Sequence, residues 1–205
     1  MISCPRHARS LAELGAAELA AIAAAWRGRA EAARADAFAY LHAFLNEGRP
    51  AGASLAHSHT QLVFLREVPE AVGVERTYRG DCGVCELLAD DDYTVAEQDG
   101  LLCVAHPAGR LPYELLVAPR DHESGGFASE RLPSALDLLA GAIRRLHALE
   151  GPLPLNAWLH DNGHWHLELV PRLSILAGVE LGAGISVNAL PPETAAAALR
   201  DQSAS

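Results

Sequence analysis

The sequence has no apolar run of the ~20 residues that a membrane-spanning helix needs, and its first residues lack the apolar core of a signal peptide. It has no excess of basic residues: 16 lysines and arginines against 26 aspartates and glutamates give a net charge of −10. This balance argues against non-specific nucleic-acid binding. Four cysteines in 205 residues do not indicate a disulfide framework. We therefore expect a cytoplasmic protein with no nucleic-acid or membrane partner.

Two common nucleotide-binding motifs are also missing. The sequence contains neither GxxxxGK(S/T) nor a GxGxxG that follows a strand, so P-loop and Rossmann chemistry are not expected. The glycine-rich stretch at residues 178–184 fits neither pattern. Its carboxylate, Glu180, is interpreted either as a hydrogen-bond partner for a sugar or as a solvated residue at the end of a strand.

What the chain does have is a hydrophobic content of 50%, enough for one large or two small domains with a core. Ser10 and Glu13 form a capping-box pattern ahead of a long alanine-rich helix. Residues 69–80 are expected to be a connector. Helical spacing predicts helices over residues 16–35, 132–149 and 191–200. Apolar or alternating runs predict strands over residues 37–45, 55–65, 93–97, 101–106, 113–118, 156–160 and 165–170.

The order of these elements indicates an imperfect internal repeat. Pro-Arg-His at residues 5–7 precedes a helix, a strand and an HxHxQ motif at residues 57–61. Pro-Arg-Asp-His at residues 119–122 precedes a helix, a strand and an HxHxE motif at residues 164–168. The second copy has additional strands in front. The repeat predicts an α+β protein of antiparallel sheets with packed helices, made of two halves at residues 1–75 and 76–205, the first incomplete at its N-terminus.

The HxHxQ motif predicts a nucleophile. Alternate side chains of a strand share a face, so His57, His59 and Gln61 would point the same way. One imidazole among hydrogen-bonding neighbours suits attack at phosphorus; the alternative is a surface strand with incidental histidines. By the repeat, His57 matches the first histidine of the second motif and is structural, which leaves His59 as the nucleophile. Gln61, Ser54 and the amides around Gly52 would stabilise charge on phosphoryl oxygens.

The Cys82-x-x-Cys85 pair is open to three interpretations: a redox pair, half of a metal site or two buried thiols. No strand-to-helix context supports the redox pair. Zinc needs two more nitrogen or sulfur ligands. His122, which follows a predicted strand, and His164, which opens the second HxH motif, are candidates for them. We predict a metal site of these four residues. The matching positions of the first half are His7 and His57, which have no cysteine pair unless Cys4 contributes.

The second HxH motif is expected to be non-catalytic. Glu168 stands where the first motif has a glutamine, and a carboxylate would repel a phosphate. A weaker interpretation makes His160, His166 and Glu168 a further metal site.

The spacing of residues 46–61, Asn-x-Gly-x3-Gly-x-Ser-x2-His-x-His-x-Gln, resembles the active-site signature of galactose-1-phosphate uridylyltransferases, in the histidine-triad superfamily. The similarity extends through residues 5–7, 164–166, 171–172, 178–180 and 192–193. Family members often carry proline between the two histidines and glycine after them, where this chain has Ser58 and Thr60. The resemblance implies two histidine-triad-like halves.

The resemblance also implies a double displacement in galactose metabolism. His59 would attack the α-phosphorus of UDP-glucose, release glucose-1-phosphate and pass the uridylyl group to galactose-1-phosphate. The nucleotide sugar and the hexose-1-phosphate are then the partners, with Asn46, Ser54 and Gln61 at the phosphates and Glu180 at the hexose hydroxyls.

The cofactor implied is zinc, with His7 and His57 as two of four ligands whose cysteine pair lies upstream in the family, in a part that this chain is expected to lack. A homodimer whose sites borrow residues from the neighbour is implied as well. The alternatives are another histidine-triad enzyme, such as a sugar-nucleotide phosphorylase or hydrolase, or a non-catalytic, zinc-stabilised remnant.

Overall fold

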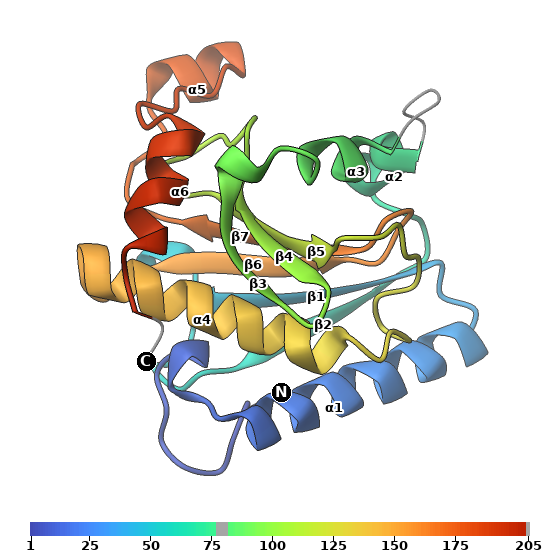
Figure 1. Cartoon of the computed structure of the whole chain (residues 1–205). Helices are drawn as coiled ribbons and strands as arrows, with labels where there is room; N and C mark the ends of the chain where they lie inside the picture. The colour runs from blue at the N-terminus through green and yellow to red at the C-terminus, as the bar shows by residue number, and fades with distance from the viewer. Residues whose placement is uncertain (77–81, 204–205) are drawn as a thin grey trace.

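The described chain is organised around one seven-stranded sheet (Figure 1). The structure is a computed structural model that describes residues 1–76 and 82–203. Every pair of neighbouring strands is antiparallel, as predicted, but the two halves share one continuous sheet. In the order of the sheet the strands are β2 (Thr60–Leu65), β1 (Tyr40–Glu47), β6 (Leu155–His160), β7 (His166–Pro171), β5 (Leu115–Pro119), β4 (Leu101–Ala105) and β3 (Thr94–Gln98).

Long helices cover one face of the sheet (Figure 1). α1 (Ala16–Ala35) and α4 (Leu132–Glu150) pack against each other, and α6 (Pro192–Arg200) lies against α4, β3 and β4. None of the helices in the described ranges has the length and apolarity to cross a bilayer. The short elements are α2 (Glu70–Arg76), α3 (Gly83–Leu87), α5 (Gly178–Ala183) and three 3₁₀ turns, η1 (Leu11–Glu13), η2 (Arg49–Ala51) and η3 (Asp91–Tyr93).

Strand β1 shows why the sheet has two different faces. Leu41, Ala43 and Leu45 are buried in the core beneath the long helices. Because side chains alternate along a strand, His42, Phe44 and Asn46 lie on the other face. We call this second face of the sheet the polar face. It bears the candidate functional residues and a small apolar cluster next to α3, while burial of the first face supplies most of the hydrophobic stabilisation.

The two halves meet at the centre of the sheet. β1 pairs with β6, so that Asn46 lies opposite Asn156 and Phe44 opposite Trp158. The order α1-β1-β2 matches α4-β6-β7, as the repeat predicts. An isolated antiparallel bridge joins Ile2 to His59, just before β2. Ile2 thus lies beside the first half in the position that β5 has beside β7 in the second half. The boundary between residues 75 and 76 stays a prediction.

Several local expectations were wrong. The capping box of Ser10 and Glu13 caps η1, while α1 begins after Gly15. The first two predicted strands begin later than expected, at Tyr40 and Thr60, because the residues before them lie in turns and bends. The expected connector contains α2, and its residues 77–80 lie outside the described ranges. α5 forms at residues 178–183, where a strand end was one interpretation.

Glu47, the last residue of β1, is an unpredicted buried carboxyl group that is 5% exposed. Its Oε1 accepts the backbone N–H of Leu11 at 2.6 Å. Burial raises the pKa of Glu47 to about 7, because the hydrogen bonds from Leu11 and Ser10 only partly offset the loss of hydration.

We expect Glu47 to make stability fall with rising pH. Its folded-state pKa lies above the ordinary value of 4.5, so the folded state binds more protons between these two values. The contribution of Glu47 to the free energy of unfolding is then fully present below pH 4.5 and is lost as the pH rises through about 7. Glu47→Gln should remove up to roughly 3 kcal/mol of this dependence, measured by urea unfolding at pH 5 and pH 8. The exposed control Glu31→Gln should behave like wild type; an unchanged pH dependence in Glu47→Gln would contradict the account.

Candidate active site and metal centre

His59 is held in one ring orientation just before β2. Its Nδ1–H donates to the carbonyl oxygen of His57 at 2.9 Å, an assignment that follows because a carbonyl only accepts. The other ring nitrogen, Nε2, is buried and has no hydrogen-bond partner among the described residues. Nε2 is thus not engaged by the protein, and it is the atom that a nucleophilic histidine with a bonded Nδ1–H uses.

His57 is arranged differently from His59. Its Nε2–H donates to the carbonyl oxygen of Cys4 at 3.0 Å. The backbone N–H of Ser3 donates to the carbonyl of Ser58 at 3.1 Å, so the N-terminal segment lies directly against the HxH segment. His57 thus fixes the strand start, although both histidines lie outside β2 itself.

Asn46 and the loop after β1 come together around an amide that the sequence did not reveal. Asn156 of β6 donates through Nδ2 to Oδ1 of Asn46 and to the carbonyl of Ala51, both at 2.8 Å. Gly52 has the left-handed φ of +88°, and a Cβ there would lie 3.7 Å from Nδ2 of Asn46. Ser54 is exposed on the same loop. Gln61 lies on β2 opposite Phe44, on the polar face.

The structure does not bring Glu180 to this site within one chain. Glu180 lies on α5, which Figure 1 shows beyond α6 and away from the β1–β2 end of the sheet. Its carboxylate accepts the N–H of Ala177 at 2.9 Å, and this hydrogen bond lowers the pKa of Glu180. Here it caps its own helix.

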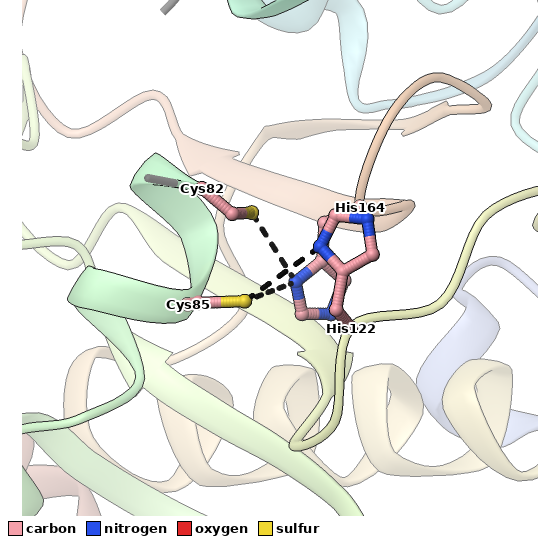
Figure 2. Close-up of side chains that lie close together, drawn as sticks. All are labelled: Cys82, Cys85, His122 and His164. Atoms are coloured by element: carbon pink, nitrogen blue, oxygen red, sulfur yellow. Dashed lines mark hydrogen bonds between the residues drawn. The ribbon is translucent and has the colours of Figure 1, made fainter. Parts of the chain in front are cut away.

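The predicted metal set is assembled from three separate segments (Figure 2). Cys82 and Cys85 lie at the start of α3, His122 follows β5 and His164 precedes β7. The Nδ1 atom of His164 is 3.6 Å from Sγ of Cys82 and 3.3 Å from Sγ of Cys85. Sγ of Cys85 is 3.7 Å from Nδ1 of His122, and the four ligand atoms all lie within 4.8 Å of one another.

These distances fit a tetrahedral metal ion. Ligand atoms about 2.0–2.3 Å from a tetrahedral zinc are about 3.5 Å from each other. The Nε2–H of His164 donates to the carbonyl of Pro119 at 2.8 Å, which leaves its Nδ1 free to ligate. Burial and the neighbouring Cys82 raise the pKa of the Cys85 thiol to about 11, so metal binding would have to displace its proton.

The matching histidines of the first half form an incomplete set. The rings of His7 and His57 meet edge to face at 5.4 Å between centroids. His57 bonds to a backbone carbonyl as His164 does. Over the described residues, however, no group of three ligand atoms includes either His7 or His57.

A second cluster lies on the polar face of β6 and β7. Oε1 of Glu168 is 3.2 Å from Nδ1 of His160 and 3.5 Å from Nε2 of His166. Burial alone would raise the pKa of Glu168, but the two histidines and Arg110, 3.3 Å away, lower it to about 2. The cluster borders a cavity of about 480 Å³ that is also lined by Trp158. These three ligands could hold a cation, and their carboxylate disfavours a phosphate.

The α+β fold with one antiparallel sheet is shared with solved structures of galt-like and ADP-glucose phosphorylase proteins. The family described as galactose-1-phosphate uridyl transferase, N-terminal domain, matches residues 1–69. ADP-glucose phosphorylase of Arabidopsis thaliana is 28% identical over 225 residues, covering 99% of this chain and 64% of its own length. Galactose-1-phosphate uridylyltransferase of Thermotoga maritima is 27% identical over 194 residues, covering 81% of this chain and 61% of its own length.

Solved structures agree. The crystal structure of an Arabidopsis thaliana ADP-glucose phosphorylase with bound ADP-glucose has a TM-score of 0.88 at 28% identity, covering 98% of this chain and 71% of that one. A galt-like protein of the same plant has a TM-score of 0.89 at 27% identity, covering 98% of this chain and 74% of that one. The chain is thus similar to galactose-1-phosphate uridylyltransferases and to an ADP-glucose phosphorylase, and it spans somewhat less than two thirds of the length of these two curated relatives.

We expect the Cys82 cluster to bind about one divalent ion per chain, because it supplies four ligands at tetrahedral spacing. Cys82→Ser and Cys85→Ser should lose the ion and melt at lower temperature, as measured by elemental analysis after dialysis and by thermal unfolding. The control for metal content is Cys103→Ser, which should retain the ion, since Cys103 is buried on β4 outside the cluster. A folded, metal-free wild-type protein would contradict the assignment.

Proposed function

We propose that this chain transfers a nucleotidyl group through a covalent intermediate on His59. The observation that carries the proposal is the His59 ring, whose Nδ1–H is committed to the His57 carbonyl while Nε2 is buried and has no hydrogen-bond partner within the described ranges. An imidazole held this way directs Nε2 to attack at phosphorus. Because Nε2 is buried, neighbouring segments must move as substrate enters.

The reaction takes place in two displacements. Nε2 of His59 bonds to the α-phosphorus of a nucleotide sugar, the bond from that phosphorus to the bridging oxygen breaks, and the sugar 1-phosphate leaves with the electron pair. An oxygen of an acceptor phosphate then attacks the same phosphorus, and the N–P bond breaks to regenerate His59. The side chains of Gln61, Asn46 and Ser54 and the amides near Gly52 offer hydrogen-bond donors for the phosphoryl oxygens.

Two acceptors are supported by the relatives. With a hexose-1-phosphate the chain would be a UDP-glucose:hexose-1-phosphate uridylyltransferase of galactose metabolism, as the Thermotoga relative's name suggests. With inorganic phosphate it would be a phosphorylase of ADP-glucose. The second candidate is favoured by coverage, since the phosphorylase aligns with 99% of this chain and the uridylyltransferase with 81%.

Zinc is the metal that suits the Cys82 cluster. Two thiolates and two imidazoles are a common zinc ligand set, and four protein ligands leave no open position for a substrate. The ion would be structural, joining α3 to the residues before β7. His164, one of its ligands, lies two residues before His166, so the metal would also stabilise the cluster on the polar face. His7 and His57 could ligate zinc only with two further ligands.

A homodimer is part of the proposal. The segment 173–187 exposes seven large aliphatic side chains, with Ile175 92% and Leu181 73% exposed. Apolar surface of this kind marks interaction sites in soluble proteins. If a second copy covers this segment, Glu180 could contact the hexose in the partner's site.

The proposal predicts a nucleotidyl adduct. Purified protein is incubated separately with UDP-glucose and ADP-glucose, and the intact mass is measured. Wild type should gain a uridylyl or adenylyl group, and the nucleotide that gives the adduct identifies the base. His59→Ala should give none while remaining folded. His166→Ala, the matched histidine of the second half, should still form it.

Three outcomes separate the alternatives. Equal loss of the adduct in both histidine variants would contradict a single active half. No adduct in folded, metal-loaded wild type would favour a binding remnant over an enzyme. An adduct that is discharged by inorganic phosphate, but not by galactose-1-phosphate, would identify the phosphorylase.

A further inference from the structure

Asn46 and Asn156 join the two halves across the central strands. They lie directly opposite each other on β1 and β6. Nδ2 of Asn156 donates to Oδ1 of Asn46 at 2.8 Å and to the carbonyl of Ala51 at 2.8 Å. One amide group thus contacts both a predicted phosphate ligand and the loop that follows it.

The two ends of an amide side chain differ chemically. The oxygen only accepts hydrogen bonds and the nitrogen only donates them. Because Asn156 engages Oδ1 of Asn46, the NH₂ group of Asn46 faces the other way, towards Gly52. Gly52 has no side chain there, and a Cβ would lie 3.7 Å from that nitrogen. The carbonyl of Ala51 excludes the reverse orientation of Asn156, since two acceptors would then face each other.

We infer that Asn156 is a positioning residue for nucleotidyl transfer: it fixes the side-chain amide of Asn46 with its NH₂ group towards the bound phosphate. The inference rests on the proposed function. Without the hydrogen bond from Asn156, the Asn46 amide can rotate and turn its oxygen towards the phosphoryl oxygens, which carry negative charge. Asn156 belongs to the second half of the chain, so the site of the first half is completed by its neighbour.

Asn156→Asp tests this directly, because aspartate has the same shape but no N–H donor. The Asn46 amide should then rotate to donate to the new carboxylate. We expect the rate constant of adduct formation to fall by about tenfold to a hundredfold at saturating nucleotide sugar. The matched control is Asn188→Asp, since Asn188 also donates through Nδ2 to two carbonyls, those of Gly109 and Leu111. It should react at the wild-type rate.

A double-mutant cycle distinguishes positioning from a structural role. In an Asn46→Ala background, Asn156→Asp should cause no further loss of rate, because its target is gone. Asn156→Ala, which removes the donor without adding charge, should show the same pattern with a smaller loss if the aspartate variant does not fold. Equal losses on both backgrounds, or a wild-type rate in Asn156→Asp, would overturn the inference while leaving the proposed function intact. Absence of the adduct in wild type would overturn both.

Discussion

The pairing of β1 with β6 is the interaction on which the rest of the structure depends. It turns two similar halves into one sheet, with α1 and α4 side by side on one face. The opposite face then carries residues from both halves in continuous rows, such as Asn46 beside Asn156 and Phe44 beside Trp158. A site on β1 or β6 therefore borders the other half, as Asn46 borders Asn156.

The two halves use this common frame for different chemistry. Where the first half has the neutral amide of Gln61, the second has the carboxylate of Glu168, which is surrounded by His160, His166 and Arg110. A carboxylate with imidazole neighbours offers ligands to a cation and repels a phosphate, whereas amides and an imidazole nitrogen without a hydrogen-bond partner suit a phosphate. The difference in charge between Gln61 and Glu168, on equivalent strands, thus gives the two halves different ligand preferences.

The sequence was most informative where periodicity is long or chemistry is specific. The limits of α1 were predicted to the residue. The four residues of the Cys82 cluster, which the structure brings together, were predicted as one set because the repeat placed two histidines in equivalent positions. The start of β2 was not predicted, because Leu55 continues an apolar pattern yet is 54% exposed in a bend. Asn156 could not be found, because alternation gives the face of a residue but not which strand lies beside it.

The buried Nε2 of His59 has a thermodynamic consequence. An acceptor that is removed from water without a partner costs about 1–3 kcal/mol of folding free energy. In the described fold, Nε2 of His59 therefore has a higher free energy than it would have if it were hydrogen-bonded to water. A phosphorus centre that bonds to this nitrogen replaces no hydrogen bond to water, so the desolvation of the nucleophile has already taken place during folding. The stability of the unliganded chain and the reactivity of its histidine are set by the same atom.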